Sequence, residues 1–442
     1  MSSVSSLEEL QAIADKVIAQ AVPGEQIEAH VTRSRETDIR VYQGKLEHFV
    51  SAQSQGISVR VIRDGRTGMS HAGVLTDVAV AEVLAEAREN AELGSVDEWA
   101  GLAEPDGVAI VKQELWDDTL DAFDTAKKIE IAKELERQAV AADSRVRIDD
   151  ANYSDNASEE AFATTMGIRS NGRTNNCYAT VSVMADDNGE TQTGYAYALG
   201  KNPAEFDLVE AGHKAAARAT RLLGAVKPQS KRITVVLDPM VTAQFLSIIA
   251  STVNGENVSK GRSIFANRIG EEVASPLITL IDDPTDSRAY TAHEIDSEGL
   301  AARRNVLIKD GVLQMFVHSS YSARRMQTKS TGNGSGCGAL QLVPGTKTQE
   351  ELIADIEEGV LIDSVQGLHS GVNPISGDFS TGASGLMIRN GKTAEPVREF
   401  TIASTLQNML KNVIAVGGDV DWLPARAAGV SLVIADITMS GE

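Results

Sequence analysis

A His-Glu pair is the pattern in this sequence that most directly suggests chemistry. His293 and Glu294 lie in the segment TAHEIDSEG, which matches the start of the HExxH pattern of zinc peptidases. In that pattern two histidines of one helix bind zinc and the glutamate acts as general base. The second histidine should occupy position 297, or position 298 in the longer HExxxH version, but Ser297 and Glu298 stand there. The pair therefore does not by itself predict a zinc site.

The histidines and cysteines form no local site elsewhere. No two of the seven histidines are four or five residues apart, so no helix presents a local zinc-binding pair. A metal site assembled from distant residues stays open. Cys177 lies among strand residues and is predicted to be a core side chain. Cys337 has no histidine near it in sequence, so we interpret it as unreactive, although neighbours in space could still make it a nucleophile.

Three further segments contain residues that could bind a ligand. The run Ser330–Gly338 (STGNGSGCG) is rich in glycine, but the lysine of a P-loop does not follow it; we expect a mobile loop whose backbone approaches a ligand or partner closely. Asp282, Asp283 and Asp286 could bind a hard cation, yet a polar turn after the strand PLITLI is the favoured interpretation. The segment SGDFS (376–380) lacks the Gly-x-Ser-x-Gly elbow of serine hydrolases. These residues alone indicate no catalytic constellation.

The composition narrows the function classes. The chain has 442 residues, 42% of them hydrophobic, and a formal charge of -21, which disfavours direct binding to nucleic acid. Two cysteines exclude a disulfide framework and fit a reducing cytoplasm. No secretory leader is visible, and no run approaches the roughly 20 apolar residues that span a bilayer. We expect a soluble, cytoplasmic protein of several domains with no membrane contact.

Hydrophobic periodicity predicts grouped strands and helices in the first half. The N-terminal segment predicts an amphipathic helix capped by Ser5 or Ser6. Residues 29–61 alternate as an antiparallel meander, with turns at Gly44, Gly56 and Asp64-Gly65. Strands resume at residue 145, with a hairpin around residues 187–189. Helices are predicted over 78–93, 125–143 and 208–223.

The second half is predicted to be rich in strands. It begins after a linker over 227–231 with the buried strand RITVVL, and helices are predicted over 242–253, 348–358 and 402–412. Because strands and helices are grouped rather than alternating, we predict an α+β fold. The predicted domains are an N-terminal mixed domain with antiparallel strands and long helices (1–226) and a C-terminal, mainly antiparallel β domain (232–442).

Several blocks together resemble the TldD/PmbA family, also called the modulator-of-DNA-gyrase family. In the second half these blocks are KGRSIFANRIGE, IDSEGLAARRNVLIKDGVL, YSARRM with KSTGNG, GVNPISGDFSTGASGLMIRNGK and LKNVIAVGGD. In the first half they are QGKLEHFVSAQSQGISVRVI and NGETQTGYAYALG. The resemblance extends over essentially the whole chain in the family's order.

The resemblance implies which branch of the family the chain is similar to. The TldD branch has an HExxxH zinc helix and a downstream cysteine ligand, whereas the TldE/PmbA branch lacks these ligands and pairs with it. Counting back from the KGRSIF block, the three zinc-helix positions fall on Leu246, Ser247 and Ser251, and the cysteine position falls near Ala428-Gly429. None of these residues is a usual zinc ligand. The resemblance thus implies no catalytic and no metal-binding residue in this chain.

The expected function is a non-catalytic TldE/PmbA-type subunit of a cytoplasmic zinc-dependent peptidase that acts on unfolded peptides. The resemblance implies a heterodimer with a TldD-type subunit that carries the zinc, and a homodimer is also possible. Two alternatives stay open: an autonomous hydrolase with an unrecognised site, and a regulatory protein linked to DNA topoisomerase. Candidate residues facing a peptide channel or the partner are Ser330, Thr331, Gly332, Asn333, Gly334, Gly377, Asp378 and Ser380.

Overall fold

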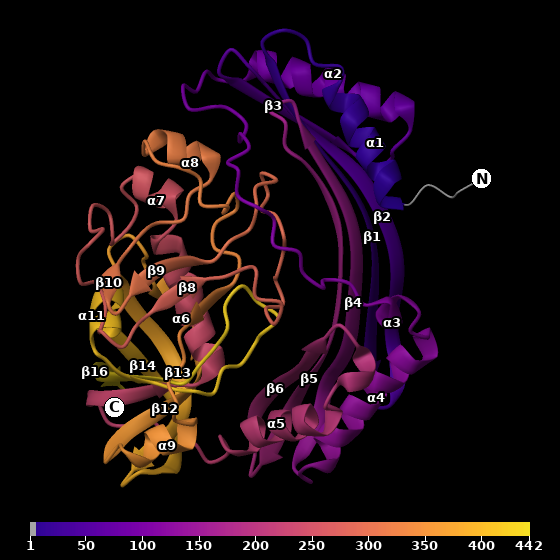
Figure 1. Cartoon of the computed structure of the whole chain (residues 1–442). Coiled ribbons are helices and arrows are strands. Elements are labelled where there is room, and N and C mark those ends of the chain that lie inside the picture. The colour runs from indigo at the N-terminus through magenta and orange to yellow at the C-terminus, as the bar shows by residue number, and fades with distance from the viewer. Residues whose placement is uncertain (1–5) are drawn as a thin grey trace.

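A long antiparallel sheet dominates the N-terminal half in the computed structural model, which describes residues 6–442. The strand order is β3-β2-β1-β4-β5-β6. Four of the six strands have 18 or 19 residues, and Figure 1 shows the sheet curving around the C-terminal half. The strands are β1 (Glu25–Tyr42), β2 (Lys45–Arg63), β3 (Arg66–Ala72), β4 (Val146–Thr164), β5 (Arg169–Asp187) and β6 (Glu190–Gly200).

Tight turns join the neighbouring strands, as the sequence predicts. At Gln43-Gly44, Asp64-Gly65 and Asn188-Gly189 both central residues have positive φ, the backbone of two-residue hairpin turns. The predicted break at Gly56 is wrong, because Gly56 pairs with Thr32 inside an unbroken β2. A Cβ on Gly56 would lie 3.0 Å from the carbonyl oxygen of Ala72, so this glycine allows β3 to approach instead of turning the chain.

Helices cover the two ends of this sheet. The helices α1 and α2 pack against one end, and α4 and α5 pack against the other (Figure 1). The helices predicted for the first half are confirmed with small shifts at their ends. The predicted cap Ser5 lies outside the described residues. The helical segments are α1 (Ser6–Ile18), α2 (Asp77–Leu93), α3 (Asp118–Asp121), α4 (Thr125–Ala141), the 3-10 turn η1 (Pro203–Glu205) and α5 (Leu208–Thr220).

The C-terminal half contains two further sheets. The larger has the order β14-β13-β12-β7-β16-β15, and an additional pairing of β14 with β16 closes it. Its β7 and β12 are parallel, while its other pairs are antiparallel. The strands are β7 (Lys231–Leu237), β12 (Glu358–Gln366), β13 (Asp378–Arg389), β14 (Lys392–Thr405), β15 (Val413–Val416) and β16 (Leu432–Ser440).

The smaller sheet lies within a region of long loops. Its short strands are β8 (Leu280–Asp282), β9 (Asn305–Lys309), β10 (Val312–Leu313) and β11 (Leu340–Leu342). The prediction that the second half is rich in strands is therefore met only in part in this region. The α+β class as a whole is confirmed. No helix within residues 6–442 is long and apolar enough to cross a bilayer.

Two predicted helices of the C-terminal half are shorter than expected. Residues 402–405 end β14 because Ile402 is buried and pairs with Met439, so the helix begins only after its cap Thr405. Glu358 likewise begins β12 instead of ending a helix. The helices of this half are α6 (Pro239–Thr252), α7 (Gly255–Ser259), α8 (Ser320–Arg325), α9 (Gln349–Ala354), α10 (Leu368–Gly371) and α11 (Leu406–Lys411).

The interface between the two halves is mostly polar. In the described chain, one small buried apolar cluster includes residues from both halves: Ala103, Phe162, Ile168 and Leu300. The buried members of the larger clusters each come from one half. Ion pairs also join the halves, among them Arg303–Asp106, Arg218–Asp238, Arg221–Asp363, Lys214–Asp421 and Arg398–Glu190.

The ion pair between Arg221 and Asp363 contains the most buried carboxylate of these five pairs. Arg221 caps the C-terminal end of α5 and donates to Asp363 of β12 at 2.7 Å. The Asp363 side chain is 6% exposed, and burial raises its pKa to about 6 although Arg221 acts in the opposite direction. The pKa of an aspartate in an unfolded chain is about 4. Between these pH values the folded state binds more protons than the unfolded state, so stability falls as pH rises through this window.

Replacing Arg221 tests whether this pair holds the halves together. In Arg221→Gln the carboxylate of Asp363 stays buried without its cation, which costs about 3 kcal/mol when the group is ionised. We expect a lower apparent unfolding temperature at pH 7.5 and a smaller loss at pH 5.5, where Asp363 becomes protonated, as measured by circular dichroism. The control Arg232→Gln removes an exposed pair with Asp436 and should change little. An equal or larger loss at pH 5.5 would contradict the assignment.

Candidate functional site

The three zinc-helix positions lie together on α6. This helix begins with the cap Asp238, whose side chain accepts from the N–H of Met240, and with Pro239 in its first turn. Leu246 is 1% exposed and belongs to the C-terminal core. The Ser247 hydroxyl donates to the carbonyl of Ala243 at 2.9 Å, and the Ser251 hydroxyl donates to the carbonyl of Ile248 at 2.7 Å.

These side chains do not fit a zinc ion. A leucine has no donor atom, and both serine hydroxyls are bonded to carbonyls of their own helix. The expected position of a cysteine ligand holds Ala428 and Gly429, and a Cβ on Gly429 would lie 2.0 Å from the carbonyl oxygen of Pro239. Within residues 6–442, no three side chains of His, Cys, Asp or Glu are grouped as metal ligands.

His293 and Glu294 lie in the interface between the halves, some forty residues after α6. The Nδ1 atom of His293 lies 2.8 Å from the carbonyl oxygen of Thr291. The Glu294 carboxylate accepts from the backbone N–H of Gln113 at 2.9 Å and from Lys112 at 2.6 Å. These hydrogen bonds, with that of the Gln113 amide to the His293 carbonyl, connect the 112–113 segment to the C-terminal half.

Asp282 fixes the glycine-rich loop. It is fully buried at the end of β8, and its carboxylate accepts from the backbone N–H groups of Gly338 and Ala339, both at 2.8 Å, and from the Asn333 amide at 2.7 Å. Burial raises its pKa, and these three donors oppose that shift. The predicted polar turn begins only at Asp283, which caps Thr285, so this role of Asp282 was not predicted.

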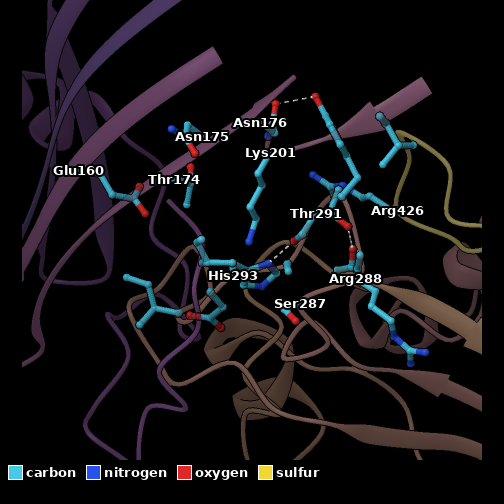
Figure 2. A pocket seen from close by; sticks show the side chains of 18 of the residues that line it. Glu160, Thr174, Asn175, Asn176, Lys201, Ser287, Arg288, Thr291, His293 and Arg426 are labelled. Atoms are coloured by element: carbon cyan, nitrogen blue, oxygen red, sulfur yellow. Dashed lines mark hydrogen bonds between the residues drawn. The ribbon is translucent and has the colours of Figure 1, made fainter. Parts of the chain in front are cut away.

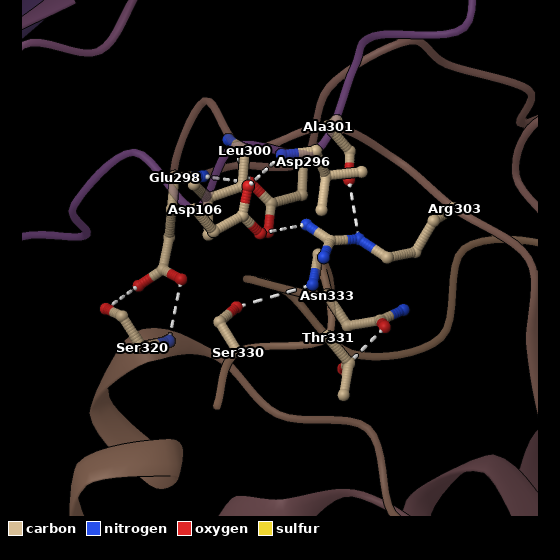
Figure 3. A network of polar contacts seen from close by, with 12 residues as sticks. Asp106, Asp296, Glu298, Leu300, Ala301, Arg303, Ser320, Ser330, Thr331 and Asn333 are labelled. Carbon is tan, nitrogen blue, oxygen red and sulfur yellow. Dashed lines mark hydrogen bonds and ion pairs between the residues drawn. The ribbon is translucent and has the colours of Figure 1, made fainter. Parts of the chain in front are cut away.

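A second network holds the other side of the loop (Figure 3). Asp296 accepts from the N–H groups of Glu298, Leu300 and Gly334, at 2.8 to 2.9 Å. Burial, with the nearby charge of Glu298, raises the pKa of Asp296. The Glu298 carboxylate in turn accepts from the N–H and the hydroxyl of Ser320 at the start of α8. The Asp-Ser-Glu-Gly segment therefore shapes the loop and positions α8.

The first group of candidate channel residues lies in this hydrogen-bonded loop. Gly332 and Asn333 are buried, and Ser330, Thr331 and Gly334 are partly buried. A Cβ on Gly332 would lie 2.5 Å from the carbonyl oxygen of Ala301, so the predicted close approach is to the chain's own backbone. The sequence predicts a mobile loop here, but the loop is held by hydrogen bonds to Asp282 on one side and to Asp296 on the other.

The second group of candidates lies elsewhere, at the start of β13. Gly377 is buried with φ of 89°, and its carbonyl accepts from Leu406. Asp378 and Ser380 are exposed, and the Asp378 carboxylate accepts from Ser376. The described hydrogen bonds of residues 377–380 stay within residues 372–407, so none joins them to the glycine-rich loop.

Both cysteines are buried thiols. Burial raises the pKa of Cys177 and of Cys337, so neither is a thiolate at neutral pH. Cys177 belongs to an apolar cluster, which confirms its prediction as a core residue. The nearby carboxylate of Asp282 adds to the shift at Cys337. Neither thiol is set up as a nucleophile.

A cavity of about 470 Å³ lies between the halves, and we call it the interface cavity (Figure 2). Its walls include residues 174–176 and 199–200 of the long sheet, Lys201 just after it, the loop 287–297, the glycine-rich loop and Arg426. A neighbouring cavity of about 730 Å³ shares Leu115, Glu160, Thr174, His293 and Ile295 with it. Sequence reasoning missed Lys201 and Arg426 here, because more than two hundred residues separate them and no motif contains either one.

Three family models match the chain. They are described as PmbA/TldA metallopeptidase domain 1 (28–91), central domain (118–223) and C-terminal domain (230–441). The chain belongs to the PmbA/TldD family. The predicted resemblance is confirmed, including the order of its blocks along the whole chain.

Relatives of this PmbA/TldD family member match over nearly their full length. The metalloprotease PmbA of Escherichia coli O157:H7 is 25% identical over 454 residues, which are 100% of this chain and 99% of that protein. A Thermotoga maritima structure labelled a modulator of DNA gyrase has a TM-score of 0.90 and 26% identity, covering 97% of this chain and 99% of that one. TldE from Thermococcus kodakarensis, at 21% identity and a TM-score of 0.89, shares the fold over 99% of this chain and 100% of its own.

The role of Asp282 can be tested by proteolysis. In Asp282→Asn the amide nitrogen would face the Asn333 amide nitrogen, donor against donor, inside a buried site. We expect local opening of the loop and roughly tenfold faster trypsin cleavage after the exposed Lys329, followed by mass spectrometry. Asp283→Asn is the matched control, because Asp283 caps an adjacent turn without contacting the loop. Equal cleavage rates in the two variants would show that Asp282 does not hold the loop.

Proposed function

We propose that this chain is a non-catalytic, TldE/PmbA-type subunit of a cytoplasmic zinc-dependent peptidase that acts on unfolded peptides. Its zinc would be held by a TldD-type partner in a heterodimer, and the chain itself would hold none. The proposal depends mainly on the side chains at the three zinc-helix positions of α6. Leu246 is part of the core, and the Ser247 and Ser251 hydroxyls donate hydrogen bonds to carbonyls of the same helix. Membership in a metallopeptidase family supplies the reaction class.

Within this proposal the candidate channel residues divide into two roles. Gly332, Asn333 and Gly377 are buried and would maintain the shape of their loops. Asp378 and Ser380 are exposed and would be available to a partner or a peptide. Because these two follow each other on the same face of β13, an extended segment could contact both side chains at once.

Reconstitution with a TldD-type chain that has an intact HExxxH helix tests the proposal. We expect substoichiometric zinc in the purified chain by elemental analysis and no cleavage of an unfolded peptide. Adding the TldD-type chain should produce cleavage, and replacing the glutamate of that chain's HExxxH motif should abolish it. The variant Ser247→Ala/Ser251→Ala of this chain should leave the activity of the complex unchanged.

Two outcomes would overturn this assignment. One tightly bound zinc per chain, or peptide cleavage by the chain alone, would favour the autonomous hydrolase. Salt-sensitive binding to duplex DNA would favour a role on DNA, as the label of the Thermotoga structure suggests for that protein. The charge of -21 argues against the second outcome, because an acidic surface repels phosphate backbones.

A further inference from the structure

The interface cavity carries positive charge in a strongly acidic protein. Lys201 follows the last residue of β6, and Arg426 lies in the loop before β16, so the two cations come from opposite halves. Figure 2 shows the ammonium end of Lys201 directed toward the turn that contains Thr291 and His293, with Arg426 entering from the other half. Unpaired charges of one sign in a cavity concentrate ligands of the opposite sign.

Neither cation is neutralised by an ion pair within residues 6–442. The Lys201 ammonium donates to the backbone carbonyl of Glu114, which is uncharged. Burial lowers the pKa of Lys201, and the nearby carboxylates of Glu114 and Asp117 act in the opposite direction without forming an ion pair with it. At Arg426 the backbone carbonyl accepts from the N–H of Leu340, whereas its guanidinium has no hydrogen-bond partner in the described chain. Donors therefore remain free on both side chains.

The acidic groups of the same cavity are already engaged. Glu160 lies 3.0 Å from the His30 ring nitrogen, and Asp296 accepts three backbone N–H groups. The third cation of the wall, Arg288, is paired with Asp286 at 2.6 Å. Two free cations thus stand beside carboxylates that already have partners, so the cavity is complementary to an anion.

We propose that the interface cavity binds a carboxylate of a bound peptide between Lys201 and Arg426. A lysine and an arginine that line the same cavity can each make a charge-assisted hydrogen bond to a carboxylate oxygen. A volume of about 470 Å³ admits one or two residues, and the neighbouring cavity of about 730 Å³ offers room for the residues beside them. The carboxylate would belong to an Asp or Glu side chain or to the peptide C-terminus. The proposal deepens the peptide-handling function and rests on it.

Four labelled peptides distinguish the two sources. One unfolded ten-residue sequence is made with an internal Glu or Gln, each with a free or an amidated C-terminus, and Kd is measured by fluorescence anisotropy. Losing the carboxylate that the cavity holds should raise Kd roughly tenfold, as expected for a buried hydrogen bond to a charged group. A dependence on the side chain assigns an acidic residue, and a dependence on amidation assigns the C-terminus.

Variants that remove the charges of Lys201 and Arg426 test whether the carboxylate of the peptide binds in the interface cavity. Lys201→Gln keeps a donor for the Glu114 carbonyl, and together with Arg426→Gln it should raise Kd to the level of the neutral peptide and abolish the difference between peptides. Lys392→Gln removes one positive charge at the exposed start of β14, outside the cavity, and should change Kd little. Unfolding temperatures of all variants verify that the fold is intact. If peptides bind and Kd depends on neither the carboxylates nor these cations, the proposal is wrong.

A small probe separates this site from the proposed function. Saturation-transfer NMR with N-acetylglutamate and N-acetylglutamine tests the cavity without any peptide. If the glutamate binds in a manner that requires Lys201 and Arg426 while no peptide binds, the site stands and the peptide-handling function fails. If neither probe nor peptide binds, or if both probes bind equally in the wild type and the double variant, the carboxylate site is overturned.

Discussion

The polar contact between the long sheet and the C-terminal half is the constraint on which the candidate site depends. Each half buries its own apolar core, and one cluster of four residues joins them. The contact also includes oriented hydrogen bonds, such as those of Arg324 with the carbonyls of Trp99, Gly101 and Leu102, and the aromatic contact of Tyr178 with Tyr290. Interfaces between the domains of one chain resemble transient, more polar protein interfaces, and the interface cavity lies at this boundary.

Buried carboxylates maintain the geometry on the C-terminal side of that boundary. Asp282 and Asp296 together accept hydrogen bonds from five backbone N–H groups and from the Asn333 amide, and they hold the glycine-rich loop between them. Such groups are costly to bury unless every lone pair has a donor, so the loop and the carboxylates specify each other's positions. The glycines matter because a Cβ on Gly332 or Gly334 would collide with the segment 297–301.

Local patterns in the sequence were sufficient for much of the fold. The Asp64-Gly65 and Asn188-Gly189 turns require positive φ at both residues, and the sequence predicts both hairpins for that reason. The prediction of a helix was wrong where strand pairing in the folded chain overrode the local preference. Ile402, for example, is buried in a strand that pairs with β16. The predicted turn at Gly56 was wrong because this glycine instead allows β3 to approach closely, and a single sequence does not distinguish that role from a turn.

The sequence by itself determined the α+β class, the family, and the absence of usual zinc ligands at positions 246, 247 and 251, because these follow from residue types at fixed spacing. Only the tertiary structure decided that Asp282 is buried and accepts hydrogen bonds from the glycine-rich loop instead of lying in an exposed turn. Burial depends on which segments pack over the end of a strand. Only the structure brought Lys201 and Arg426 to one cavity. Their meeting depends on the angle at which a curved sheet encloses the other half, and no local pattern of residues encodes that angle.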